Sequence, residues 1–339
     1  MMEMIKLPPL DEVRGRKVQN KFAGMPMAGA HLGRLEQLAV QYASMTAKSL
    51  PRKLKPHMLL MCGDHGIAKY GISAFPQEVT KQMMQGYQRG TAGAMVLARH
   101  AGAEVTVCDM GTAFDQSDLP MVKQLKVAWG TDDFTQGPAM SREQAELAVE
   151  RGMQVANDCI DKGCNLLVTA EMGIGNTTAS AAIASAFLGL EPLETVGRGS
   201  GINDARLKIK REVVSQGLEI NKPVQGDGWD VLQKLGGYDH AGLVGMILAG
   251  AQRRVPTMLD GVNATAAALV AYGICPQSRD YLFCSHFSSD LSHKRMLEFL
   301  GLEPLVDAGL RLGEGTGAAL AIPVLQLALD LYNKLGKGK

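Results

Sequence analysis

The chain has 339 residues, of which 46% are hydrophobic and 20% are charged, and its formal net charge is +1. This composition predicts a globular protein with a sizeable core, arranged as one large domain or two modest ones. The near-neutral charge gives no basic surface for nucleic acid, and no apolar run is long enough to span a membrane.

The two ends of the chain differ from its middle. After Pro26-Met27, residues 32–48 carry apolar side chains at helical spacing, so we expect a small helical region over residues 1–50. The apolar stretch at 321–339 also has helical periodicity and is a candidate to pack on that region or on a partner chain. We expect its last residues, Gly336 to Lys339, to fray.

From residue 51 to residue 320, short apolar runs alternate with helical stretches. The expected strands cover residues 57–62, 104–109, 165–170, 255–259 and 281–285, and the main helices among them cover 78–100 and 142–161. This alternation predicts an α/β fold with a doubly wound, mostly parallel, Rossmann-like sheet. Each strand runs into a glycine-rich or polar cluster, so the functional loops should share the carboxyl edge of the sheet.

Cysteine and histidine placement gives no sign of a disulfide or a metal centre. The six cysteines form no CxxC pair and lie mostly in apolar surroundings, which is typical of reduced core residues. The Asp64-His65 and Ser285-His286 pairs are isolated from each other, so we expect no metal and no cofactor. The first residues lack the apolar core of a signal peptide, which favours a cytoplasmic protein.

A strand, a glycine loop and a helix follow one another in the middle of the chain. Leu166 to Ala170 read as a buried strand, and Glu171-Met172-Gly173-Ile174-Gly175-Asn176-Thr177-Thr178 follow before a helix at 179–188. The free N–H groups of that helix favour a phosphate or carboxylate above the loop. No lysine follows the second glycine, which excludes a Walker loop, and Thr178 occupies the third glycine position of a dinucleotide fingerprint. The loop is therefore a phosphate cradle of no general type.

A single carboxylate lies among glycines near the C-terminus. Glu314 stands in Arg311-Leu312-Gly313-Glu314-Gly315-Thr316-Gly317, directly before an apolar helical run at 318–331. Glycine on both sides permits a tight turn that presents Glu314 into a cavity at the helix N-terminus. The alternative is a surface glutamate near the helix dipole.

Several of these segments resemble one family together and in the same order. The matching motifs are Gly63-Asp64-His65-Gly66, Gly71 to Thr80, Glu171 to Thr178, Gly197-Arg198-Gly199-Ser200-Gly201, Val255-Pro256, Leu259-Asp260-Gly261 and Arg311 to Ala319. Over about residues 30–330 the chain resembles nicotinate-nucleotide:dimethylbenzimidazole phosphoribosyltransferases. The resemblance implies transfer of the 5-phosphoribosyl group of nicotinate mononucleotide to an aromatic base, for the lower ligand of cobamides.

The resemblance also implies roles for particular residues. Glu314 would be the general base that takes the acceptor proton. Glu171 would be a second catalytic acid near the ribose, where it would accept hydroxyl hydrogen bonds or stabilise the developing oxocarbenium charge. Gly173, Ile174, Gly175, Asn176 and Thr177 would cradle the phosphate and ribose, and Lys210 would meet the phosphate, with Lys208 as the alternative. Ser73, Phe75 and Leu312 would hold the acceptor. The remaining expected substrate-binding residues are Asp260, Ser288, Arg311 and Gly313. Asp260, Ser288 and Arg311 rank lower, as do Asp64, His65 and Asp239, because capping of strand ends also explains them.

Two departures from the family pattern leave the acceptor and the assembly open. Residues 28–36 read Ala-Gly-Ala-His-Leu-Gly-Arg-Leu-Glu, and residues 90–95 read Gly-Thr-Ala-Gly-Ala-Met where Gly-Gly-Ala-Ala-Ile-Asn is usual. A homodimer is expected, with a heterodimer as the alternative. The other functions to consider are a phenol-accepting relative, a catalytically silent nucleotide-binding subunit, and an NAD-dependent oxidoreductase, whose fingerprint the chain lacks.

Overall fold

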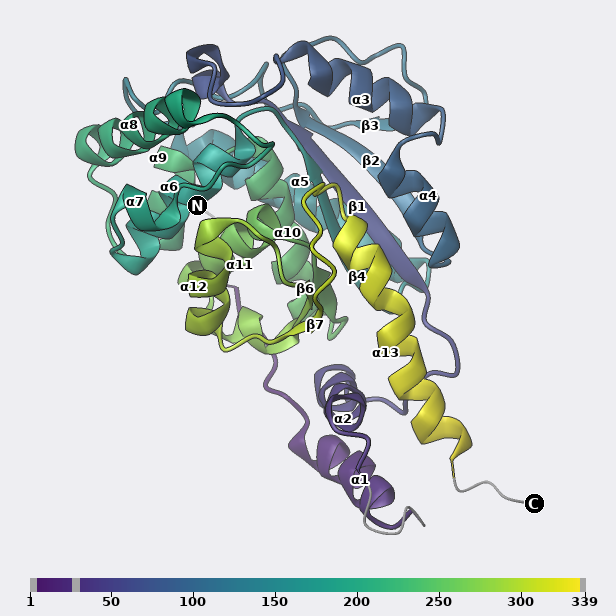
Figure 1. Ribbon diagram of the computed structural model, residues 1–339. Helices are drawn as coiled ribbons and strands as arrows, with labels where there is room; N and C mark the ends of the chain where they lie inside the picture. The colour runs from purple at the N-terminus through teal and green to yellow at the C-terminus, as the bar shows by residue number, and fades with distance from the viewer. Residues whose placement is uncertain (1–4, 26–30, 336–339) are drawn as a thin grey trace.

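A computed structural model describes residues 5–25 and 31–335. Its strands form a seven-stranded sheet in the order β3-β2-β1-β4-β5-β6-β7, and every pair is parallel (Figure 1). The strands are β1 Pro56–Gly63, β2 Glu104–Gly111, β3 Val122–Gln124, β4 Leu166–Met172, β5 Thr257–Leu259, β6 Leu282–His286 and β7 Pro304–Val306. The predicted doubly wound α/β fold is confirmed. The strand order reverses between β1 and β4, which is the point where such sheets bind ligands.

Helices connect the strands and cover both faces of the sheet (Figure 1). The helices are α1 Glu12–Ala23, α2 Arg34–Thr46, α3 Glu78–Gln88, α4 Gly93–His100, α5 Arg142–Asp161, α6 Asn176–Leu188, α7 Pro192–Thr195, α8 Asp204–Asn221, α9 Gly228–Leu235, α10 Tyr238–Gln252, α11 Val262–Ile274, α12 Leu291–Leu300 and α13 Thr316–Lys334, with 3₁₀ helices η1 Gly66–Tyr70 and η2 Pro276–Tyr281.

The sequence missed three local features of this fold. The single helix expected over 78–100 is wrong, because the chain breaks between α3 and α4, where Gly90 takes a left-handed φ of 68°. Strands β3 and β7 were not predicted at all. Each has only three residues, too few to show the alternation that reveals a strand.

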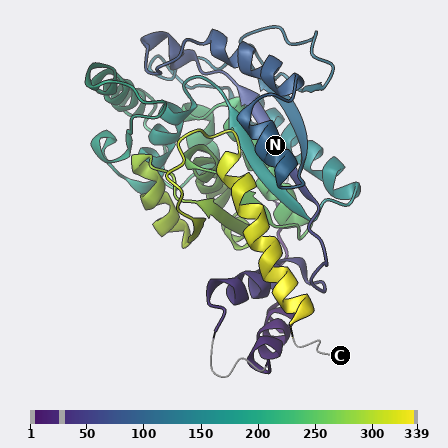
Figure 2. The same cartoon turned by 45° about the vertical axis from the view of Figure 1, so that its right-hand side comes forward.

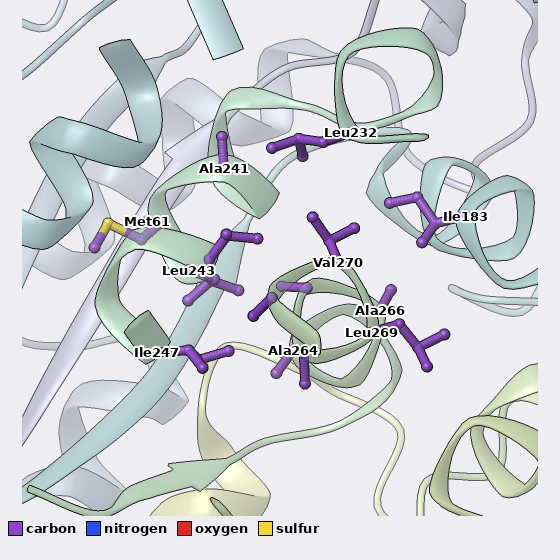
Figure 3. Packing of buried hydrophobic residues seen from close by; sticks show 14 of the residues in the cluster. Met61, Ile183, Leu232, Ala241, Leu243, Ile247, Ala264, Ala266, Leu269 and Val270 are labelled. Carbon is purple, nitrogen blue, oxygen red and sulfur yellow. The ribbon is translucent and has the colours of Figure 1, made fainter. Parts of the chain in front are cut away.

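Alternate residues of β1 enter two separate hydrophobic cores. Leu59 and Met61 pack in the core that contains the buried faces of α10 and α11 (Figure 3). Met58 and Leu60 pack on the opposite face, in the core that contains the buried side of α13. Because successive side chains of a strand point to opposite faces, β1 is buried along its whole length between two helical layers, and apart from His57 its residues are apolar.

The helices at the two ends of the chain pack together (Figure 2). Phe22 of α1 meets Tyr332 of α13 edge to face, with ring centroids 5.6 Å apart, and Lys21 donates to the Tyr332 carbonyl at 2.9 Å. Side chains of α1 and α2 share a core with α13 and with the sheet. The division at residue 50 stays a prediction. Pro26-Met27 and the fraying expected at Gly336–Lys339 lie outside the described residues.

Among the described residues, no helix combines the length and the apolar character needed to cross a lipid bilayer.

Helices α5 and α10 cross with their backbones in direct contact. A Cβ on Gly152 of α5 would lie 2.2 Å from the carbonyl oxygen of Gly242, and one on Gly245 of α10 would lie 2.0 Å from the carbonyl oxygen of Val149. Backbone atoms cannot rotate away as a side chain can. These glycines therefore set how closely α10 packs against α5 beneath the sheet.

We expect Gly152→Ala to reduce the free energy of unfolding by about 1–3 kcal/mol, because the added methyl group forces the two helices apart. Urea denaturation followed by circular dichroism measures it. Gly86→Ala in α3 is the matched control, since its Cβ would meet only Ala92 at 3.8 Å. That control should gain up to about 1 kcal/mol from helix propensity. Equal stability of Gly152→Ala and the unmutated chain would contradict the tight crossing.

Candidate active site

The loops at the carboxyl edge of the sheet enclose a cavity of about 880 Å³. The structure brings every expected catalytic and substrate-binding residue except Lys210 to its wall, whereas the lower-ranked Asp64, His65 and Asp239 do not line it. These wall residues are Ser73, Phe75, Glu171, Gly173, Ile174, Gly175, Asn176, Thr177, Asp260, Ser288, Arg311, Leu312, Gly313 and Glu314. They come from the loops that follow β1, β4, β5 and β6 and from the segment before α13. The cavity therefore lies at the carboxyl edge of the sheet, where the polar clusters after the strands predicted it.

The loop between β4 and α6 can exist only with glycine at two positions. A Cβ on Gly173 would lie 1.8 Å from the carbonyl oxygen of Gly63 at the end of β1. Gly175 has a φ of 105°, which side chains rarely adopt, and its Cβ would meet His65 at 3.0 Å. The loop therefore passes close to the end of β1, and α6 begins at the cavity wall with its free N–H groups.

Two basic residues of α8, Lys210 and Arg211, lie near the loop between β4 and α6. Lys210 is buried and its Nζ donates to the Thr177 hydroxyl at 2.9 Å, whereas the side chain of Lys208 is 81% exposed. Burial lowers the pKa of Lys210 to about 8, although nearby Asp290 opposes this. Lys210 therefore lies behind Thr177. Arg211, which sequence reasoning passed over, lines the cavity with a buried Nε that has no hydrogen-bond partner among the described residues.

Glu171 is a buried carboxylate at the end of β4. The side-chain amide of Asn176 donates to its Oε2, and Asn263 of α11 faces it from the other side. Burial raises the pKa of Glu171 to about 7, helped by the charges of Asp239 and Asp260 and opposed by Asn263. Glu171 can therefore take either charge state near neutral pH.

Glu314 sits in a strained turn at the start of α13. Gly313, Glu314 and Gly315 all have left-handed backbones, with φ of 79°, 60° and 79°. Such a conformation costs a non-glycine residue on the order of 1 kcal/mol, and such strain concentrates at functional sites. The turn aims the buried Glu314 side chain at the cavity.

Asp260 supports this turn from behind. Its two carboxylate oxygens accept the backbone N–H groups of Gly315 at 3.1 Å and Ala318 at 2.9 Å. Both oxygens are thus used by the N-terminus of α13, as expected for an acid at a helix start. The sequence suggested Asp260 as a substrate-binding residue. Its observed hydrogen bonds position Glu314.

Tyr87 of α3 is a neighbour of Glu314 that sequence reasoning missed. Burial raises the pKa of Glu314, and the Tyr87 hydroxyl lies close enough to oppose the rise. Neither that hydroxyl nor Oε2 of Glu314 has a hydrogen-bond partner within the described residues. Because Tyr87 lies in the middle of an amphipathic helix, its sequence context indicates only a core residue.

The opposite part of the wall is apolar and open. Ile72, Val79, Met83, Gly93 and Leu312 line it. Phe75 and Leu312 are 53% and 58% exposed, so these two side chains of the cavity wall are largely open to solvent.

The predicted residues at the rim hold loops together. The Ser73 hydroxyl lies 3.3 Å from that of Ser200, and Arg206 donates to the Ser73 carbonyl at 2.8 Å. Ser288 is buried beside His293, and Arg311 is exposed. The contacts of Ser73 with Ser200 and Arg206 join the loop after β1 to the start of α8 and the segment before it.

One group of ligand-type side chains lies behind the glycine loop. His65, Asp239 and His240 offer atoms within 4.8 Å of one another. Hydrogen-bond distances of 3.1–3.3 Å between Asp239 and the two imidazoles already account for the cluster. The expectation that the protein needs no metal stays a prediction.

Comparison with known proteins agrees with this geometry. A family model described as Phosphoribosyltransferase matches residues 7–338. Nicotinate-nucleotide–dimethylbenzimidazole phosphoribosyltransferases from Chloroflexus aggregans and Geotalea uraniireducens are 43% and 44% identical to the chain. These alignments cover 96% and 98% of the chain and 93% and 94% of the relatives.

The crystal structure of the nicotinate-nucleotide-dimethylbenzimidazole phosphoribosyltransferase from Thermus thermophilus superposes with a TM-score of 0.90, at 37% identity and 96% coverage of both chains. The chain therefore belongs to this phosphoribosyltransferase family.

Proposed function

We propose that the protein transfers the 5-phosphoribosyl group of nicotinate mononucleotide to 5,6-dimethylbenzimidazole or a closely related base. The products are the α-linked nucleotide and nicotinate, a step in cobamide lower-ligand synthesis. The observation that carries the proposal is the pair of buried carboxylates, Glu171 and Glu314, in one cavity between a phosphate cradle and an apolar wall.

The cavity offers each part of the two substrates a matching surface. The phosphate would lie at the N-terminus of α6, where backbone N–H groups converge and Arg211 and Lys210 add positive charge. The ribose would follow beside Glu171. The flat acceptor would lie against Val79, Met83 and Leu312, close to Glu314.

The reaction needs a base but no acid. Nicotinate in the nucleotide is a cationic pyridinium, so it leaves as a neutral ring nitrogen with the electron pair of the broken glycosidic bond. One acceptor nitrogen attacks the anomeric carbon from the opposite face and becomes bonded to it. The other acceptor nitrogen then loses its proton to Glu314, whose raised pKa makes it a better base than an exposed carboxylate.

In this scheme Glu171 stabilises charge on the ribose. As the bond to nicotinate lengthens, positive charge develops on the ribose, and a carboxylate beside the ring stabilises it. Donors from Asn176 and Asn263 favour the ionised form that this role requires.

The proposal includes a homodimer, with a heterodimer as the alternative. Turnover by the purified chain alone would argue against an obligatory second subunit.

The first test is nicotinate release from nicotinate mononucleotide, with dimethylbenzimidazole, benzimidazole, adenine and phenol as parallel acceptors. We expect release to depend on a benzimidazole. Glu314→Gln should keep nucleotide binding and lower kcat by about 10²–10⁴-fold, because the amide cannot accept the proton.

The control for that variant is Glu219→Gln, at an exposed position of α8 outside the cavity. It should behave like the unmutated chain. Full turnover by Glu314→Gln would remove Glu314 from the mechanism, and nucleotide binding without release by the unmutated chain would favour a silent subunit.

Tyr87→Phe tests how the base is tuned. The Tyr87 hydroxyl stabilises the ionised form of Glu314, so its loss should raise the pKa of that carboxyl. Activity requires the ionised base, and the acid limb of the kcat/KM profile should therefore move to higher pH. Tyr281→Phe removes a buried hydroxyl that bonds Pro8 elsewhere and should leave the limb in place. An unmoved limb in Tyr87→Phe would contradict the contact.

Gly93→Ala tests the acceptor wall. A Cβ on Gly93 would lie 3.3 Å from Leu312. We expect the added methyl group to narrow the apolar end and to reduce kcat/KM for dimethylbenzimidazole relative to benzimidazole, by about tenfold. Gly86→Ala, outside the cavity wall, is the control. An unchanged ratio would place the acceptor elsewhere.

A further inference from the structure

A continuous line of buried polar side chains leads from the interior to Glu171. It begins at Asp239 and His240 in the first turn of α10, passes Ser180 of α6, and ends at Asn263 of α11 beside Glu171. Ser180 and His240 are 0% and 1% exposed, and Asn263 reaches the cavity wall. Such a network in an apolar core is costly unless every group is satisfied, which suggests a specific use.

The hydrogen bonds along this line determine where the protons lie. The Ser180 hydroxyl donates to Oδ1 of Asn263 at 2.7 Å, and an amide oxygen can only accept. The hydroxyl has one proton, so the contact of 2.8 Å between Ser180 and Nε2 of His240 requires that nitrogen to donate.

The other side of His240 requires a second ring proton. Its Nδ1 lies 3.1 Å from Oδ1 of Asp239, and an ionised carboxylate only accepts. Although burial raises it, the pKa of Asp239 lies well below its usual range because of the two neighbouring imidazoles. His240 therefore has both ring protons and forms an ion pair with Asp239.

His65 contacts the same carboxylate. Its Nε2 lies 3.2 Å from Oδ1 of Asp239, while its Nδ1 has no partner in the described part of the chain. The carboxylates whose charges act on Glu171 are Asp239 and Asp260.

We propose that Ser180 and Asn263 are positioning residues for Glu171: protonated His240 orients the Ser180 hydroxyl, which fixes the Asn263 amide so that its NH₂ group donates to the Glu171 carboxylate. If the Asn263 amide were reversed, its oxygen would face Glu171. Glu171 would then have to be protonated in order to donate a hydrogen bond to that oxygen. The same proton thus resides either on His240 or on Glu171, and Asp239 holds it on His240.

The inference rests on the proposed function, because it supplies the ionised Glu171 that the developing ribose charge requires. Its test needs a readout that does not depend on turnover. Nitrogen NMR of protein labelled with ¹⁵N-histidine provides one, since protonated and bare ring nitrogens resonate in separate ranges. His240→Gln assigns the signals among the seven histidines.

In the unmutated protein, at the pH of the activity assay, both ring nitrogens of His240 should carry a proton. Ser180→Ala removes the acceptor of the Nε2 proton, so it should change the Nε2 signal, and it should slow nicotinate release by about tenfold or more, with KM for the nucleotide changed less than kcat. Ser185→Ala is the matched control on the same helix, because its buried hydroxyl bonds Thr195 at 2.6 Å. It should change neither the signals nor the rate.

Three outcomes would overturn the inference. They are a bare ring nitrogen on His240 in the unmutated protein at the pH of the activity assay, identical behaviour of Ser180→Ala and Ser185→Ala, and a stoichiometric metal ion bound to His240. If the chain released no nicotinate at all, the proposed function would fail, while the histidine signals would still report the network.

Discussion

The carboxylate of Asp260 joins two parts of the chain on which the cavity depends. Asp260 directly follows β5, and its carboxylate accepts hydrogen bonds from the N–H groups of Gly315 and Ala318 at the start of α13. This contact fixes the long C-terminal helix to the sheet edge and holds Glu314 in its left-handed turn. Because α13 also packs on α1 and α2, the same helix links the cavity to the far end of the molecule (Figure 1).

The two cavity carboxylates lower the stability of the fold at neutral pH. Burial raises the pKa of Glu171 from its ordinary 4.5 to about 7, so between these two pH values the native state holds a proton that the unfolded chain has released. This group therefore favours folding most below about pH 4.5, and that stabilisation is lost as the pH rises to 7. The difference is on the order of 3 kcal/mol. An acid that costs this much is retained for its chemistry.

The sequence was sufficient for the parts of the site that depend on local pattern. Strand-loop-helix order located the Glu171 loop, and flanking glycines located Glu314, because both features lie within a few residues. Tyr87 and Asn263 were not predicted, because in the sequence each is typical of a buried helix face. Their roles depend on neighbours more than 90 residues away in the chain. Lys210 could be separated from Lys208 only by observed burial.

Glu171 and Glu314 share one cavity but have different supports, which suits different tasks. Glu171 lies at the end of a central strand and receives amide donors from Asn176 and Asn263, so its charge is stabilised from several sides. Glu314 stands on a turn with one hydroxyl near it and an Oε2 that accepts no hydrogen bond from any described residue. A carboxylate that must only remain charged benefits from donors, whereas one that must accept a proton needs a free oxygen. This difference in hydrogen bonding, more than the similar burial of the two acids, assigns electrostatic support to Glu171 and proton transfer to Glu314.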